Sequence, residues 1–166
     1  HPSLPVRNIR ELVALAKAKP GQLNFASSGS GTPGHLAGLM LNDAAGIEMT
    51  HIPYKGSAPA LTAMVSGETQ LIFSSLTSTL ALVKSNRLRA IAMSSVKRSP
   101  LMPTLATVAE SGYPGFEAIT WFGLFLPAGA PSAITTKLNT EFVKVLNNPD
   151  FKAWLDRKST RLNSSH

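Results

Sequence analysis

The residues with the clearest chemical potential lie in one stretch rich in glycine and serine, Leu23 to Gly46. Its apolar start, Leu23 to Ala26, predicts a buried strand, and a loop of small residues follows. Thr32 can cap a helix that has Pro33 at its first position and ends at Gly46. A helix N-terminus behind a loop of small side chains leaves backbone N–H groups free for an anion. The stretch therefore predicts an anion site, and a plain tight turn is the alternative.

The same loop can be compared with the nucleotide-binding fingerprints. Residues 29–34 spell G-x-G-x-x-G between a strand and a helix. A dinucleotide site also needs an acidic residue at the end of the next strand. That expected strand, Ile47 to Ile52, carries Glu48 near its start and ends without an acid. A dinucleotide site is therefore disfavoured, and a P-loop is disfavoured because no lysine follows the last glycine.

Small polar residues follow other expected strands as well. The strands expected at 70–73 and 88–93 are followed by the serine pairs 74–75 and 94–95, and the strand at 47–52 is followed by the loop 54–57. Because the carboxyl ends of parallel strands face one crevice, these groups would converge on a ligand. Hydroxyls and free N–H groups suit a carboxylate. The alternative is that each serine serves only as a local cap or turn residue.

Helix and strand patterns alternate along the chain, which predicts an α/β fold with a largely parallel sheet. Capping boxes at Asn8/Glu11 and Thr107/Glu110 predict helix starts, Ser57 is expected to cap a helix that ends at Gly67, and 121–126 is expected to be a strand. A long amphipathic helix is expected at 132–147. The apolar residues expected to face inward are Leu36, Leu39, Met40 and Ala44, then Leu61, Met64 and Val65, then Ile134, Leu138, Phe142 and Val145.

Length and composition favour one domain of about this size. The chain has 166 residues, 43% of them hydrophobic, and no apolar run long enough to cross a membrane. Cysteine is absent, which excludes disulfides and thiolate metal sites, and the four histidines have no metal-like spacing. The first residue is His1 rather than methionine, so we expect a fragment.

The last 11 residues, 156–166, resemble a translated sequencing adapter, so we expect a non-native tail there. Without this tail the basic residues fall from 16 to 13 and the acidic residues from nine to eight, which changes the net charge from +7 to +5. The remaining basic residues are scattered and form no patch with aromatic residues. A nucleic-acid partner is therefore disfavoured.

Several short motifs together carry a family resemblance. With them, residues 1–155 resemble the substrate-binding receptors of tripartite tricarboxylate transporters, the Bug-type extracytoplasmic solute receptors. The motifs are the segments 1–5, 16–17, 20–21, 26–36, 53–61, 97–100, 107–110 and 121–123.

The resemblance implies a periplasmic-binding-protein-like fold of type II, with two lobes that close on a small carboxylate. Residues 1–120 would be most of the second lobe, and 121–155 would return to a first lobe whose other parts are absent. The implied protein is not an enzyme and needs no cofactor or metal. It would be periplasmic, with a signal peptide in the missing N-terminal part, and would pass its ligand to membrane permease subunits without inserting into the membrane itself.

The resemblance also implies ligand-binding residues. One departure concerns position 74, where many members have an aspartate that can pair with the ammonium of an amino acid, whereas this chain has serine. We therefore expect a di- or tricarboxylate or an aromatic acid. The alternatives are local packing for His35 and a solvated loop position for Lys55. The set is Ser27, Ser28, Gly29, Thr32 and His35 at the ligand, Tyr54, Lys55 and Gly56 at the cleft border, and Ser74 and Ser75 at a strand end.

Two other functions stay open at this point. Ser28 and His35 could act as nucleophile and base of a hydrolase, although no G-x-S-x-G elbow or orienting acid accompanies them. The other alternative is a truncated chain without activity.

Overall fold

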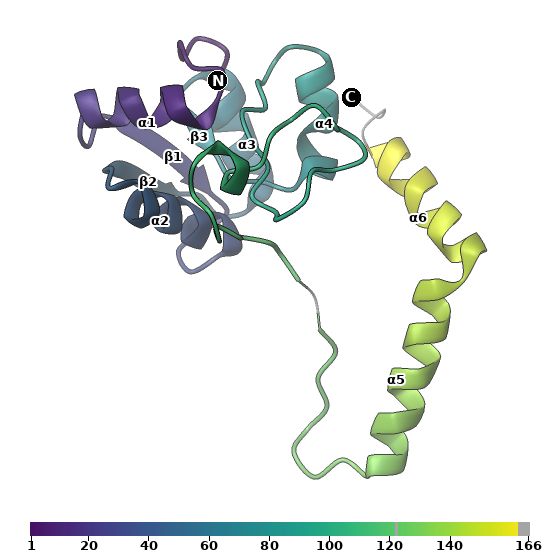
Figure 1. Ribbon diagram of the computed structural model, residues 1–166. Coiled ribbons are helices and arrows are strands. Elements are labelled where there is room, and N and C mark those ends of the chain that lie inside the picture. The colour runs from purple at the N-terminus through teal and green to yellow at the C-terminus, as the bar shows by residue number, and fades with distance from the viewer. Residues whose placement is uncertain (122, 163–166) are drawn as a thin grey trace. The chain divides into compact units, whose positions relative to one another are not determined.

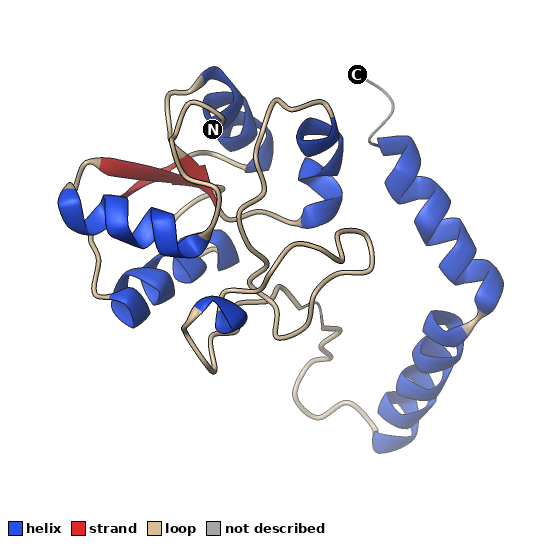
Figure 2. Cartoon of the chain, turned by 45° about the horizontal axis from the view of Figure 1, so that its top comes forward, coloured by secondary structure: helices blue, strands red, loops and turns tan. Residues whose placement is uncertain are grey.

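The computed structural model describes residues 1–121 and 123–162. Its contacts divide the chain into two compact units, His1–Thr120 and Trp121–His166. The first unit holds a small sheet with helices packed around it (Figures 1 and 2). Its elements are α1 (Ile9–Ala18), β1 (Leu23–Ser27), α2 (Pro33–Ala45), β2 (Met49–Pro53), α3 (Ser57–Ser66), β3 (Leu71–Ile72), α4 (Leu76–Lys84) and the 3₁₀ turn η1 (Ala109–Ser111).

The sheet has three parallel strands in the order β2-β1-β3, which confirms the predicted α/β class. Leu23 pairs with Met49 and Ser27 with Pro53, so β1 and β2 end together. The connections through α2 and α3 lead to opposite sides of β1. Right-handed crossovers therefore place these two helices on opposite faces of the sheet.

The core forms around β1 because this strand has a neighbour on each side. Phe25, Leu12 and Leu41 are fully buried, and they bring α1, β1 and α2 into one apolar cluster. Phe25 lies against Gly38 of α2 so closely that a β-carbon at Gly38 would collide with the aromatic ring. The small residue thus lets the helix approach the sheet.

This close approach overturns the predicted inner face of α2. Leu36, Leu39 and Met40 were expected to be buried, but they are 50%, 45% and 42% exposed. Helix α2 packs on the sheet through the face that carries Gly38, because the Phe25 ring leaves no space for a larger side chain there. In α3, Met64 is buried as predicted, whereas Leu61 and Val65 are half-buried. The residues that α2 buries are Ala37, Gly38, Leu41 and Ala45, and Ala44 is exposed.

The helix ends agree with the sequence more closely than the helix faces do. Asn8 caps α1 by accepting a hydrogen bond from the Glu11 N–H at 2.9 Å. Gly46 and Gly67 end α2 and α3 in the left-handed conformation, as predicted. Thr32 stands at the N-cap position of α2 as predicted, but its hydroxyl makes no cap bond to the helix. The predicted cap at Ser57 is wrong, because Ser57 is the first residue of α3 and Gly56 precedes it as the cap.

Two predicted strands are absent from the described residues. Residues 88–93 form no strand. Among the described residues, their β-type pairing is limited to an isolated parallel bridge between Met93 and Thr107. The described part of 121–126 is also irregular, while Phe122 lies outside the described residues. A strand needs a neighbour for its backbone groups, and neither segment has a described neighbour that pairs along its length. The strands at 47–52 and 70–73 exist with shifted ends, as β2 and β3.

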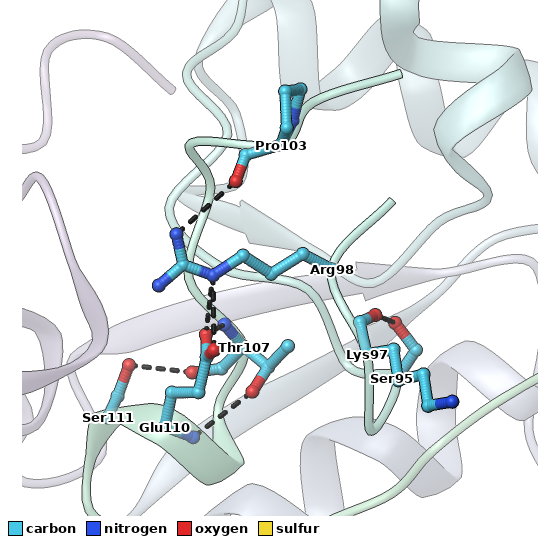
Figure 3. Close-up of polar contacts among 7 residues, drawn as sticks. All are labelled: Ser95, Lys97, Arg98, Pro103, Thr107, Glu110 and Ser111. Atoms are coloured by element: carbon cyan, nitrogen blue, oxygen red, sulfur yellow. Dashed lines mark hydrogen bonds and ion pairs between the residues drawn. The ribbon is translucent and has the colours of Figure 1, made fainter. Parts of the chain in front are cut away.

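The predicted capping box at Thr107 and Glu110 is present, although it opens only a single 3₁₀ turn (Figure 3). The Glu110 N–H donates to Thr107 Oγ1 at 3.1 Å, and the Thr107 N–H donates to Glu110 Oε2 at 2.8 Å. Arg98 Nε donates to the same carboxylate at 2.9 Å and Arg98 also reaches the carbonyl oxygen of Pro103. The Thr107 N–H and then Arg98 lower the pKa of Glu110. This network ties down a segment that has little regular structure.

The second unit contains two helices, α5 (Ser132–Asn147) and α6 (Pro149–Leu162). Helix α5 was predicted with these bounds, but its predicted inner residues Ile134, Leu138, Phe142 and Val145 are 40% to 51% exposed. Helix α6 was not predicted, and it runs into the expected tail, whose residues 163–166 lie outside the described range. Among the described helices, none is long and apolar enough to span a membrane.

Candidate functional site

The ends of the three strands meet at one edge of the sheet. The Tyr54 N–H donates to the carbonyl oxygen of Ser27 at 3.0 Å, and the Gly56 N–H donates to that of Ser28 at 3.1 Å. These bonds join the loops that follow β1 and β2. At the third strand, a β-carbon on Gly34 would lie 2.7 Å from the carbonyl oxygen of Phe73. The structure therefore brings the predicted site segments 27–35, 54–56 and 73–75 together.

The loop Ser27–Thr32, called the binding loop below, is held by its own hydroxyl groups. Ser27 Oγ donates to the carbonyl oxygen of Gly29 at 2.9 Å and accepts from the Gly29 N–H at 3.1 Å. Thr32 Oγ1 donates to the same carbonyl oxygen at 2.7 Å. Ser27 is only 1% exposed. Ser27 and Thr32 thus shape the loop, and their hydroxyl groups are engaged within it.

Backbone N–H groups are the free donors at this edge. The N–H groups of Ser28, Ser30, Gly34 and His35 make no hydrogen bond to any described residue. Those of Gly34 and His35 belong to the first turn of α2, where the helix leaves its N–H groups unpaired and its dipole is positive. Such an arrangement can hold a carboxylate without a charged side chain.

His35 stacks on a second histidine that the sequence reasoning missed. The rings of His35 and His51 have centroids 3.8 Å apart and planes 20° apart. His51 Nε2 lies 2.6 Å from Ser27 Oγ, and His35 Nδ1 accepts from the Gly31 N–H at 3.0 Å. Burial and then the neighbouring His35 lower the pKa of His51. One feature could have indicated His51. Strand β2 pairs with β1, and in that pairing His51 lies directly beside Phe25.

The three residues predicted at the cleft border differ in their contacts. Tyr54 turns its hydroxyl to Glu68 at 2.9 Å, and burial together with Glu68 raises the pKa of Tyr54. Lys55 is exposed and makes no polar contact with a described residue, which leaves its charge available to an anion. Gly56 has φ of 116°, a conformation that favours glycine, and it joins the two loops through its N–H.

The serines after β3 form a separate cluster of hydroxyl groups. Ser75 caps α4 by accepting from the Ser78 N–H at 3.4 Å, which supports the local role for this residue. Ser74 Oγ lies 3.1 Å from Ser78 Oγ, and both residues are exposed. The position thus offers hydroxyl groups and no negative charge.

The hydrolase alternative finds no support in this geometry. Ser28 and His35 make no hydrogen bond to each other. The serine that does contact a histidine is Ser27, which is buried and bonded within the loop. No acidic side chain binds His51 in the described part of the chain. The described residues also contain no cluster of side chains that could hold a metal ion.

A cavity of about 160 Å³ lies among α1, β3, α4 and the segment 88–94. Its walls are mainly apolar. Arg89 belongs to these walls, but it already donates to the carbonyl oxygens of Leu4 and Val6 at 3.1 and 3.0 Å. Of the predicted site residues, Ser74 alone lines this cavity. It therefore does not coincide with the free N–H groups at the start of α2.

The sequence and the fold of this chain are similar to those of known proteins. Residues 1–162 match the sequence model described as the tripartite tricarboxylate transporter family receptor. A UPF0065 protein of a Pseudomonas species is 41% identical over 145 residues, which cover 87% of this chain and 43% of that protein. An R. palustris protein solved with adipate has a TM-score of 0.82 and 35% identity, covering 92% of this chain and 51% of its own. The periplasmic binding protein BugD has a TM-score of 0.80 and 34% identity, covering 98% and 53%. The chain thus spans about half the length of these relatives.

Proposed function

This chain belongs to the tripartite tricarboxylate transporter receptor family, and we propose that it captures a small carboxylate and delivers it to the membrane permease of such a transporter. The observation that carries the proposal is the set of free N–H groups at the start of α2. They lie where the ends of three parallel strands meet, which is where such folds bind ligands. Lys55 adds a positive charge on the adjoining loop.

The proposal includes a periplasmic location and a division of the chain between two lobes. Residues 1–120 would be most of the second lobe, 121–155 would belong to the first lobe, and 156–166 would be a non-native tail. The contact boundary between Thr120 and Trp121 supports the lobe assignment. The likeness to BugD, a periplasmic binding protein, supports the location.

The proposed ligand is a carboxylic acid without an ammonium group. Ser74 places a hydroxyl at the end of β3 and no carboxylate that could pair with an ammonium. The solved neighbour with adipate supports this class, because adipate is a dicarboxylate without a positive charge. A Ser74→Asp variant should therefore gain affinity for aspartate relative to succinate. Tighter binding of acidic amino acids than of plain carboxylic acids by the unaltered protein would contradict the proposed class.

Binding by this chain alone should be weak, because the chain would supply the ligand-binding groups of one lobe and few of those of the other. We expect a dissociation constant well above the micromolar range. A micromolar dissociation constant corresponds to a binding free energy of about −8 kcal/mol. The intact receptor should bind more tightly. It should gain about 2.7 kcal/mol of stability at a ligand concentration 100 times the dissociation constant.

The direct test follows backbone amide resonances of this chain while adipate is added. The amides of Ser28, Gly34 and His35 should shift, because they are the donors that carry the proposal. The neutral diamide of adipic acid is the matched ligand control, since it keeps the shape and loses the charge. Equal shifts with the diamide, or shifts confined to the cavity beside Arg89, would contradict the proposal.

A further inference from the structure

The stacked histidines lie at the base of the binding loop and are not explained by ligand contact alone. His35 comes from the first turn of α2 and His51 from the middle of β2. Both rings also pack near Phe25, with centroid distances of 6.5 and 5.1 Å. Both residues are partly buried. Two elements of the fold are therefore used to place a pair of ionisable rings in contact.

Each histidine holds a different point of the binding loop. His35 accepts the N–H of Gly31, whereas His51 contacts the Ser27 hydroxyl, which in turn binds both backbone groups of Gly29. Gly29 and Gly31 have φ values of 144° and 77°. Glycine in such conformations has many alternatives of similar energy. The two imidazoles thus add to the bonds by which Ser27 and Thr32 hold the loop in one conformation.

The contact of His35 requires a particular protonation state. His35 Nδ1 accepts an N–H, so it carries no proton, and a proton there would face the N–H of Gly31. A charge on one ring also disfavours a charge on the other at this separation. Burial of His51 acts in the same direction on its pKa.

Other charged groups near the pair are few. The rings make polar contacts with Ser27 and Gly31, and neither is charged. On the segment after β2, Tyr54 is bonded to Glu68, and Lys55 makes no polar contact with a described residue. No acidic side chain in the described part of the chain contacts either ring. Nothing on the adjoining elements therefore compensates a positive charge on the pair.

We propose that His35 and His51 are positioning residues, and that they hold the binding loop in its carboxylate-binding form only while His35 is uncharged. This inference rests on the proposed function, and it adds that acidification releases the loop and weakens binding. A histidine that contacted the ligand as a cation would act oppositely, because its charge would attract the carboxylate. The sign of the pH dependence thus separates positioning from direct contact.

The first arm of the test needs no ligand. The amide resonances of Gly29 and Gly31 and the histidine rings are followed by NMR from about pH 8 to about pH 5.5, across the ordinary histidine pKa. The loop amides should move together with ring protonation. His35→Gln keeps a neutral acceptor and should remove most of that movement, whereas His1→Gln is a matched control outside the loop. Loop amides that stay fixed while the rings titrate would overturn the inference.

The second arm measures the affinity for adipate over the same pH range. The unaltered chain should lose about tenfold in affinity between neutral and acidic pH, a typical coupling between two sites. His35→Gln should lose much less, and the difference between the two removes the effect of ligand protonation. A rise in affinity on acidification, or equal losses in both proteins, would overturn the inference. No binding at any pH would overturn the proposed function, while the ligand-free arm would still decide whether the histidines hold the loop.

Discussion

Gly34 in the first turn of α2 lies so close to the end of β3 that an added β-carbon would be 2.7 Å from the carbonyl oxygen of Phe73. A backbone atom cannot move aside as a flexible side chain does. The contact therefore sets the distance between the start of α2, with its free N–H groups, and the strand that leads to Ser74. Glycine at this position keeps the proposed carboxylate site assembled.

Substitution Gly34→Ala should therefore damage both stability and the site. Forcing a methyl group against the Phe73 carbonyl should cost about 1–3 kcal/mol, the usual range for overpacking. The amide shifts that adipate induces in α2 should also decrease. Urea unfolding and NMR measure the two effects. Ser30→Ala, at an exposed position of the same loop, should change stability little, and equal effects of the two substitutions would contradict this role for Gly34.

The contact between Gly38 and Phe25 can be tested by combining substitutions at both positions. Gly38→Ala should destabilise the chain by about 1–3 kcal/mol because the Phe25 ring is fully buried and has no room to move. Phe25→Leu alone should also destabilise it by loss of packing. The double variant should lose less than the sum of the two, since the smaller side chain relieves the clash. Additive losses in this double-mutant cycle, measured by urea unfolding, would show that the contact is not limiting.

Stability should also depend on pH through His51. Burial and then His35 lower the pKa of His51 in the folded chain below its ordinary value of 6.5. As the pH falls, the unfolded chain therefore takes up this proton first. The contribution of neutral His51 is complete above about pH 6.5 and is lost as the pH falls from there to the folded pKa. Urea unfolding at several pH values should show this loss, and His51→Gln should reduce it, whereas a slope of opposite sign would contradict the assignment.

The features that sequence predicts well here are local ones. The caps at Asn8 and Thr107 and the glycine stops at Gly46 and Gly67 follow from hydrogen bonds and backbone angles within a few residues. The meeting of strand ends also follows from the alternation of strands and helices, because parallel strands must end at one edge. These rules predict that the candidate site segments lie together, as they do in the structure.

The features that sequence missed depend on partners far along the chain. The buried face of α2 is set by the Phe25 ring, which excludes the larger apolar residues that periodicity selects. The expected strand at 88–93 lacks a described neighbour along its length, so its apolar residues remain irregular. His51 was passed over because its partners, Ser27 and His35, are 24 and 16 residues away. Periodicity contains no information about such contacts.

Glu110 provides a test of how the segment 95–111 keeps its shape. Its carboxylate accepts from the Thr107 N–H and from Arg98, and these contacts lower the pKa of Glu110 in that order of importance. Glu110→Ala should destabilise the chain more than Glu110→Gln, which keeps an acceptor but loses the charge. A lowered carboxyl pKa means that the stabilisation is present above the ordinary value of 4.5 and is lost as the pH falls below it. Equal stability of the two variants, measured by thermal unfolding at neutral pH, would exclude the acceptor role.

The apolar face of α5 predicts that this chain associates with itself. Leu138 and Phe142 are 40% and 44% exposed on one side of the helix, with Ile134 and Val145 nearby on the same side. An exposed apolar stripe of this kind favours burial against another molecule. Sedimentation should therefore show concentration-dependent association. The double substitution of Leu138 and Phe142 by lysine should abolish the association, whereas lysine at Thr136 and Asn139 adds the same charge and should leave more of it. A monomer at all concentrations, or equal effects of the two charge additions, would mean that the apolar stripe does not drive association.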